Sequence, residues 1–298
     1  MDARRDVPQG RGEVMDAVVN NVYRRRLLGH RIGIALSVTA MAVGLGFLLW
    51  ILETLLVNGF GALSHTLFTM DTPAPGSPGG VRNAIVGSLM MVGLSTAIST
   101  PVGILAGIYL AEYGQNNKFA TVTRFVTDIM LSAPSIVIGL FVYALVVARI
   151  GHFSGYAGTV ALSLIAIPVV VRTTDNMLHL VPNSLLEAAF ALGAPRWKVA
   201  MMVRLRAVKA GVVTGVLLAV ARIAGETAPL LFTALNNQFF SLDMKQPLAN
   251  LPVAIYLFAM SSYEDWRSLA WGAALLVTFS VLLLNILSRT LFRQKTPQ

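Results

Sequence analysis

The chain has 298 residues, of which 55% are hydrophobic and only 12% are charged, with a mean hydropathy of +0.69 and a formal net charge of +9. Soluble domains carry roughly a quarter charged residues, so this composition excludes an ordinary soluble protein. The sequence contains no cysteine, which excludes disulfide frameworks and thiolate metal sites, and its four histidines are not spaced as metal ligands.

The first part of the chain predicts a tail, a leading span and a loop. Residues 1–30 are polar and basic, and we expect them to form a loosely ordered cytoplasmic tail. The apolar run Ile32–Leu52 predicts an uncleaved transmembrane helix over residues 31–57. Residues 58–80 include the Pro/Gly stretch Asp71–Gly80, which cannot be helical. We therefore expect this segment to be a periplasmic loop outside the hydrocarbon.

Five further apolar runs fill residues 81–292 and predict a five-helix core. Each run is close to or above the roughly 20 residues that a membrane-crossing helix needs. No alternation typical of barrel strands occurs in them, so we predict an all-α integral membrane protein with six transmembrane helices and a short cytoplasmic tail at 293–298. The runs are Asn83–Ala111, Ile129–Ala148, Ile150–Val171, Ala210–Leu242 and Ser268–Ser288.

The second apolar run is rich in small residues. Gly103 and Gly107 form a G-x-x-x-G step, which lets two helix backbones approach closely. A span with so many small side chains cannot face lipid all round. We therefore predict that this helix lies at a crowded helix interface.

The basic residues are distributed unevenly over the predicted loops. The loops near 53–82, 149–157 and 236–267 hold four of them, whereas the other side holds seventeen, with Arg172 at its border. Cytoplasmic loops carry the excess of Lys and Arg in membrane proteins. We therefore expect both termini and the loop 175–209 to be cytoplasmic, and we expect no nucleic-acid partner.

The longest cytoplasmic loop predicts a short helix with both ends specified. Ser184 and Glu187 are spaced as a capping box, and Gly193 can take the left-handed conformation that ends a helix. The small residues Ala188 and Ala189 lie between them, beside larger apolar side chains. A small, apolar helix of this kind can bind in a groove of another protein.

The same helix carries a family resemblance. Glu187-Ala188-Ala189, three further residues and then Gly193 resemble the cytoplasmic signature loop of binding-protein-dependent ABC importer permeases. In that family the loop docks onto the nucleotide-binding subunit, so the resemblance assigns Glu187, Ala188, Ala189 and Gly193 to ATPase coupling. Val203 follows the family pattern, but Leu205-Arg206 stands where the family has a Leu-Pro pair.

Longer blocks resemble one branch of this family, the phosphate permeases of bacterial phosphate-specific transport systems. The resemblance implies a type I ABC importer (MetI-like) permease fold in the bacterial inner membrane, and a permease that translocates inorganic phosphate. The blocks are Gly80–Ser88, Ala133–Leu140, Val171–Thr174, Ala221–Ala234 and Gln246–Pro252.

The resemblance also implies the partners of the chain. They are a second, different permease subunit, a dimer of nucleotide-binding ATPase subunits and a periplasmic phosphate-binding protein. The sequence contains no G-x-x-x-x-G-K-[ST] loop for nucleotide phosphates. We therefore expect a transport subunit without its own ATPase site and without a bound cofactor, with ATP used by the partner.

Two charged residues lie inside the predicted span Ala210–Leu242. Glu226 follows Arg222 by four residues and so shares its helical face. Charges within a bilayer are costly, and the two residues alone leave open a structural ion pair or a substrate site, since a guanidinium offers forked donors to phosphate. The resemblance favours the substrate pathway. Arg172 is by position an interface arginine, and the resemblance adds it to the pathway.

Two other functions remain open from the sequence. An ion-coupled secondary transporter usually has inverted repeats and more carboxylates within its spans than Glu226 alone. An ABC permease for another oxyanion would share every feature described above.

Overall fold

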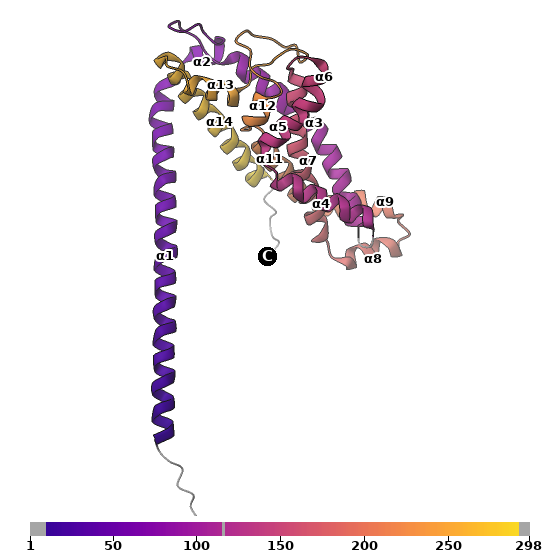
Figure 1. Cartoon of the computed structure of the whole chain (residues 1–298). Coiled ribbons are helices and arrows are strands. Elements are labelled where there is room, and N and C mark those ends of the chain that lie inside the picture. Colours follow the sequence, from indigo (N-terminus) through magenta and orange to yellow (C-terminus); the bar gives the residue numbers. More distant parts are fainter. Residues whose placement is uncertain (1–9, 115–116, 292–298) are drawn as a thin grey trace, which may run out of the picture. The chain divides into compact units, whose positions relative to one another are not determined.

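The computed structural model describes residues 10–114 and 117–291, and every regular element in these two stretches is helical. The chain divides into two compact units, residues 1–56 and residues 57–298 (Figure 1). The predicted tail at 293–298 lies outside the described residues, as do residues 1–9. The second unit contains the predicted permease core.

The described part of the first unit is helical and belongs to α1 (Gly10–Ala62), whose last residues are already part of the second unit. The helix contains the predicted leading span within a candidate membrane segment at Tyr23–Ala62. The expectation of a loosely ordered tail was wrong for residues 10–30, which are helical. No proline occurs between Pro8 and Pro73, so an apolar helix that has nucleated can propagate in both directions.

The second unit is built from short and long helices joined by turns. They are α2 (His65–Thr69), α3 (Arg82–Tyr113), α4 (Lys118–Ser132), α5 (Ser135–Val142), the π-helical turn η1 (Tyr143–Val147), α6 (Ala148–Ile150), α7 (Gly155–His179), α8 (Asn183–Ala191), α9 (Arg196–Lys198), the π-helical turn η2 (Val199–Arg204), α10 (Leu205–Ala207), α11 (Lys209–Ile223), α12 (Ala228–Leu231), α13 (Leu251–Ala259) and α14 (Glu264–Leu291).

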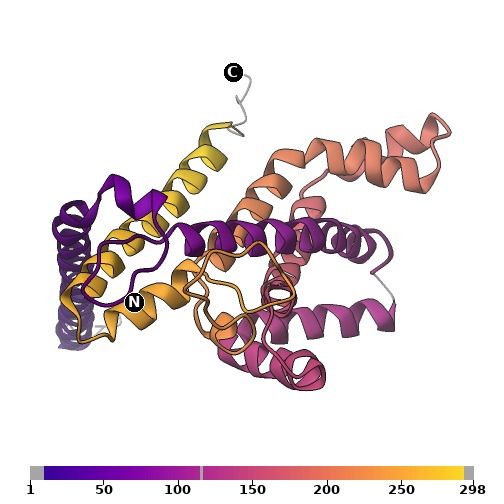
Figure 2. The same ribbon diagram turned by 90° about the horizontal axis from the view of Figure 1, so that it is seen from above.

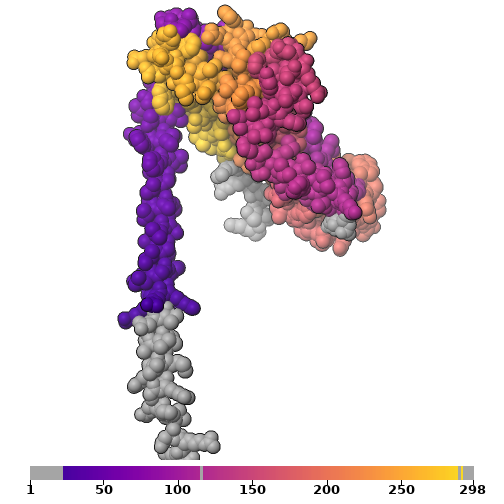
Figure 3. Space-filling model, in the orientation of Figure 1, coloured from indigo at the N-terminus to yellow at the C-terminus, as the bar shows by residue number. Residues whose placement is uncertain are grey.

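Among the described residues, α1, α3, α7 and α14 are long and apolar enough to cross a membrane. The predicted span Ile129–Ala148 is not one straight helix: α4 and α5 meet at an angle of 107°. Pro134 lies at the break, and Ala133 before it has the extended conformation that a following proline favours. In Figure 3 the residues of α4 and α5, coloured magenta, form a continuous face of the second unit.

The apolar run Ala210–Leu242, predicted to hold one span, is not one continuous helix. Helix α11 has 15 residues and ends at Ile223, a turn follows, and α12 has only four residues. Pro229 stands in the first turn of α12, where proline starts a helix and cannot continue one. This region therefore contributes a broken helix, whose turn contains Glu226.

Helix α7 lies against α3 through the predicted G-x-x-x-G step. A Cβ atom added at Gly103 would lie 2.6 Å from the Cβ of Val170, and one added at Gly107 would lie 2.6 Å from the Cβ of Thr174. Only glycine permits this approach. The prediction that Gly103 and Gly107 lie at a crowded helix interface is confirmed.

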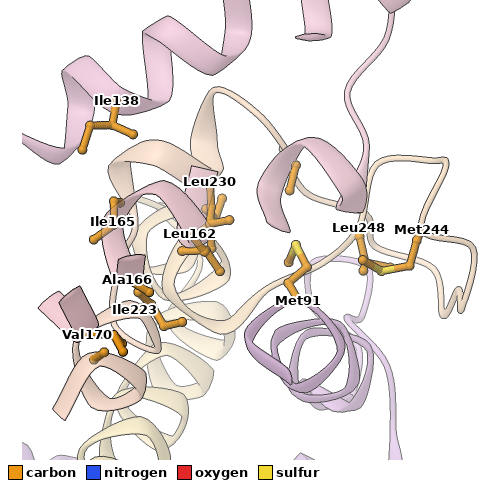
Figure 4. Close-up of a cluster of buried hydrophobic side chains, with 13 residues drawn as sticks. Met91, Ile138, Leu162, Ile165, Ala166, Val170, Ile223, Leu230, Met244 and Leu248 are labelled. Atoms are coloured by element: carbon orange, nitrogen blue, oxygen red, sulfur yellow. The ribbon is translucent and has the colours of Figure 1, made fainter. Parts of the chain in front are cut away.

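Helix α11 approaches α7 by a second glycine step, spaced in the same way. A Cβ atom at Gly211 would lie 2.3 Å from the Sδ of Met177, and one at Gly215 would lie 2.2 Å from the Cγ2 of Thr173. Helix α7 is thus held by glycines on α3 and on α11. The buried core continues from these contacts, as Figure 4 shows for side chains that converge from α3, α5, α7, α11 and α12.

A non-helical segment at 232–250 is tied down by side-chain amides. The Nδ2 of Asn83 donates to the carbonyl oxygen of Asn237 at 2.8 Å, and the Nδ2 of Asn250 donates to that of Leu235 at 3.1 Å. Asn83 and Asn250 are buried, so these bonds satisfy polar groups that would otherwise be costly. The segment lies at the end of the second unit that carries α12 and α13, whereas α8 and α9 lie at the other end (Figures 1 and 2).

We predict that Gly107→Ala destabilises the protein, because the new methyl group would overlap Thr174 and lie 3.0 Å from the carbonyl oxygen of Val171. Overpacking of this kind costs about 1–3 kcal/mol. Gly93→Ala is the matched control on α3, because a Cβ atom at Gly93 has no atom within 4 Å. The measurement is the midpoint of thermal unfolding in detergent. Equal midpoints for the two variants would contradict the glycine-step packing.

Candidate functional site

Helix α8 presents the predicted coupling residues at one end of the second unit (Figure 1). No residue of α8 is buried, and Glu187 and Ala188 are exposed. Large apolar side chains are exposed beside them, and Leu192 reaches 89%. The structure therefore brings the four predicted coupling residues together on one exposed helix and its terminal turn.

The ends of α8 confirm one prediction and correct another. Gly193 has a φ of +77°, so it takes the left-handed conformation that was predicted to end the helix. The capping box was wrong: Pro182 is the N-cap residue, no side chain caps the helix, and Ser184 lies inside it. Pro182 has the extended conformation of an N-cap residue, so the helix begins at Asn183, one residue before Ser184.

Arg222 lies near the end of α11, about 20 Å along the helix axis from Lys209 at 1.5 Å per residue. Its Nε is 3.7 Å from the Oε1 of Glu226, which is too long for a good hydrogen bond. The side chain of Arg222 is 40% exposed and that of Glu226 is 15% exposed. Glu226 was expected on the same helix as Arg222, but it lies in the turn after α11. The predicted pair therefore exists, although it is loose.

Arg172 lies within α7 and does not end it, because the helix continues to His179. Its Nη1 is 3.5 Å from the Oδ1 of Asp128 on α4, and both side chains are about half exposed. The structure thus places Arg172 on the α4 side of α7. Arg172 and Arg222 therefore pair with different carboxylates, Asp128 and Glu226.

A groove runs beside the stripe of α11 that leads to Arg222. Its volume is about 620 Å³, and both α7 and α11 line it. Thr214 and Leu218 are among its lining residues. Along α11, Leu218 follows Thr214 by four residues, and Arg222 follows Leu218 by four more. Residues at this spacing share one helical face. The open groove and the loosely paired guanidinium are therefore on the same side of α11.

Two other arginines of the second unit are closed, in the sense that short hydrogen bonds engage their guanidinium donors. Arg124 on α4 donates from Nε to the Oδ2 of Asp175 at 3.1 Å and from Nη2 to the carbonyl oxygen of Leu110 at 2.8 Å. Asp175 is buried, and it lies inside α7 and not at the start of a loop as we expected. These bonds also supply a cation to the carboxyl end of α3.

Arg204 is the second closed arginine, and it is buried. It donates from Nη1 to the Oε1 of Glu112 at 2.8 Å and from Nε to the carbonyl oxygen of Leu178 at 3.0 Å. Sequence reasoning did not single out Glu112, Asp175, Arg124 or Arg204. The available signal was weak, since each charge lies at the edge of an apolar run, where solvent exposure is the ordinary expectation.

No group of three His, Asp or Glu side chains within the described residues is placed to hold a metal ion. The charged groups that the geometry brings forward are four guanidinium groups: Arg172 and Arg222 have loose partners, and Arg124 and Arg204 are held by shorter bonds. An open guanidinium can bind an anion, whereas a closed one has its donors already in use.

Comparison with known proteins agrees with this geometry. Residues 103–295 match the family model of the binding-protein-dependent transport system inner membrane component. The chain is 59% identical to the phosphate transport system permease protein PstA of Haemophilus influenzae, over 89% of this chain and 94% of that protein. It is 55% identical to the protein of the same name from Yersinia pestis, over 89% of this chain and 90% of that protein.

The fold agrees with solved ABC importer structures. A chain of the inward-facing MetNI methionine ABC transporter superposes with a TM-score of 0.60 at 20% identity, covering 72% of this chain and 95% of that chain. The fold is thus the MetI-like fold of ABC importer permease subunits. The chain belongs to the binding-protein-dependent inner membrane transport components, and within them to the PstA permeases.

We predict that Asp175→Asn strongly destabilises the protein, because it leaves the guanidinium of Arg124 without its charged partner. Breaking a fully buried ion pair on one side costs about 3–5 kcal/mol, and we expect a smaller cost here because the Arg124 side chain is 29% exposed. Glu264→Gln is the control: Glu264 pairs with Arg267 at 3.5 Å but is 92% exposed, and an exposed pair contributes about 0–1 kcal/mol. Thermal unfolding in detergent measures both. An effect of Asp175→Asn no larger than that of Glu264→Gln would contradict the closed arrangement.

Proposed function

We propose that this chain is the transmembrane permease subunit of an ATP-driven importer that carries inorganic phosphate across the bacterial inner membrane. The names of its PstA relatives and its MetI-like fold support this function. The observation that carries it is the open guanidinium of Arg222, loosely paired and on the grooved face of α11.

Phosphate needs such a group because it carries a charge of roughly −1.5 near neutral pH. Moving that charge through a low-dielectric region requires a compensating cation. The planar fork of an arginine matches two phosphate oxygens at once. Glu226, 3.7 Å away, partly neutralises Arg222 when no substrate is bound. Phosphate, which carries more charge, then displaces Glu226 from the guanidinium. Arg172, with its loose partner Asp128, is a second cation on the pathway.

The importer needs partners to use ATP, because this chain supplies no nucleotide-binding loop. In our proposal α8 docks in a groove of a nucleotide-binding ATPase subunit through Glu187, Ala188, Ala189 and the turn at Gly193. A second permease chain of the PstC type completes the pore, and a periplasmic phosphate-binding protein delivers the substrate. The chain binds no cofactor itself, and ATP is used by the ATPase dimer.

This arrangement fixes the orientation of the chain. Residues 175–209 and both termini lie in the cytoplasm, and residues 58–80 and 236–267 face the periplasm. The distribution of basic residues supports this orientation, since cytoplasmic segments carry the excess. In this proposal residues 81–292 remain the permease core that follows the leading helix.

We predict that Arg222→Gln abolishes phosphate uptake while the subunit still inserts and assembles. The double variant with Glu226→Gln should also remain inactive, because the forked donor is missing. Arg222→Lys should restore uptake only in part, since it keeps the charge and loses the fork. The measurement is phosphate uptake at matched membrane abundance, with sulfate as the competing oxyanion.

The opposite outcome distinguishes a structural pair. If Arg222 and Glu226 only stabilise the fold, Arg222→Gln alone leaves an unpaired carboxylate, and the double variant recovers. Restored phosphate uptake in the double variant would therefore remove Arg222 from the site. Sulfate that competes as well as phosphate would leave the permease in place but change its substrate.

We predict that Gly193→Val uncouples ATP hydrolysis from phosphate uptake. A β-branched residue is strained at a φ of +77°, so the turn after α8 must change. Gly193→Asn is the matched control, because asparagine tolerates this conformation and no atom within 4 Å would meet its Cβ. Both rates are measured in the reconstituted complex. Normal coupling in Gly193→Val would reduce α8 to an ordinary exposed helix.

A further inference from the structure

The chain segment between α8 and α11 contains one buried charge, Arg204. It ends the π-helical turn η2, and it is 8% exposed. Burying a guanidinium costs several kcal/mol unless its donors are satisfied. Arg204 meets this requirement with two bonds, to the carboxylate of Glu112 and to the carbonyl oxygen of Leu178.

These two bonds connect η2 to the ends of two long helices. Glu112 is the penultimate residue of α3, and Leu178 is the penultimate residue of α7. The Nη1–Oε1 distance of 2.8 Å is the shortest of the arginine ion pairs in the described part of the second unit, a distance shared only with Arg82–Asp71. Arg204–Glu112 is the better shielded of those two, with side-chain exposures of 10% and 17%.

An apolar cluster encloses the same place. Ala200 of η2 packs with Ile108 and Ala111 of α3 and with Leu178 of α7. The ion pair therefore lies beside a dry contact, where an electrostatic interaction is stronger than in water. The charges and the apolar side chains join the same three elements.

We propose that Arg204 and Glu112 form the joint through which movement of α8 reaches α3 and α7, so that both are positioning residues for transport. This inference rests on the proposed function, in which α8 docks on the ATPase. Helix α8 contacts η2, and η2 is bonded to the ends of α3 and α7. The glycine steps then carry the displacement from α7 to α11 and its Arg222.

The π-helical geometry of η2 explains why a displacement of α8 needs the Arg204 bonds to reach α3 and α7. A π-helical turn within an α-helical run is uncommon and concentrates at functional sites. Without Arg204, η2 would keep the apolar contact of Ala200 with α3 but would lose its bonds to Glu112 and to the carbonyl oxygen of Leu178. A displacement of α8 would then be absorbed by η2 and would not reach the helix ends.

The first test compares two neighbouring arginines in the complete reconstituted complex. Arg204→Gln should lower phosphate imported per ATP hydrolysed by about tenfold, within the range typical of coupling between two sites. Arg206→Gln is the control, because Arg206 is exposed and undergoes the same chemical change two residues away. Unchanged coupling in Arg204→Gln would overturn the inference. If the unmodified complex does not take up phosphate, the proposed function is contradicted instead.

The second test replaces the ion pair by a covalent bridge, which separates a mechanical joint from a requirement for folding. The natural chain has no cysteine, so Glu112→Cys with Arg204→Cys can be linked selectively when the partner subunits are also cysteine-free. The unlinked double variant should be uncoupled. A short, reducible bis-methanethiosulfonate bridge should restore coupling, and reduction should abolish it again in the same sample.

Each outcome of the bridging experiment decides the matter. If coupling is restored only while the bridge is present, the joint is supported, since the same assembled complex is compared before and after linking. An unlinked variant that is already coupled overturns it. A linked variant that stays uncoupled overturns it as well, and so does a double variant that fails to assemble, because the pair is then a determinant of folding.

Discussion

The close approach of α3 and α11 to α7 is the contact on which the second unit depends. Two glycine steps make it possible, Gly103 with Gly107 on α3 and Gly211 with Gly215 on α11. Interfaces in membranes depend on packing rather than on hydrophobic transfer, because lipid is as apolar as the helices. Small residues on α3 and α11 therefore let both helices pack closely against α7, which is the central helix of the unit. The loosely paired arginines and the closed ones are all arranged around this three-helix body.

Four arginines of the second unit fall into two groups with different physical roles. Arg124 and Arg204 are closed by carboxylates and backbone carbonyls, and they fasten the ends of α3 and α7. Arg172 and Arg222 have partners 3.5 and 3.7 Å away and remain open to an anion. A permease that carries phosphate needs both kinds, since a pathway cation must be available and the body that carries it must be rigid.

The sequence was sufficient for the helical class, the four long helices α1, α3, α7 and α14, the Gly103–Gly107 interface and the left-handed Gly193, because each depends on local composition or backbone geometry. It was insufficient where tertiary contacts decide the conformation. The cap of α8 went to Pro182, and the apolar run after Lys209 broke at the turn before Pro229. The closed arginines were missed because their partners are distant in sequence: 92 residues separate Glu112 from Arg204. The substrate role of Arg222 remains a prediction.

The most direct test of the account is whether α3, α7 and α11 move as one body. Spin labels at the exposed residues Leu105 on α3 and Leu218 on α11 would report their separation by pulsed electron paramagnetic resonance in the reconstituted complex. The account predicts that this distance is the same in the nucleotide-free and ATP-bound states, while the distance from Leu105 to the second permease subunit changes. A Leu105–Leu218 distance that changes as much as the inter-subunit distance would contradict it.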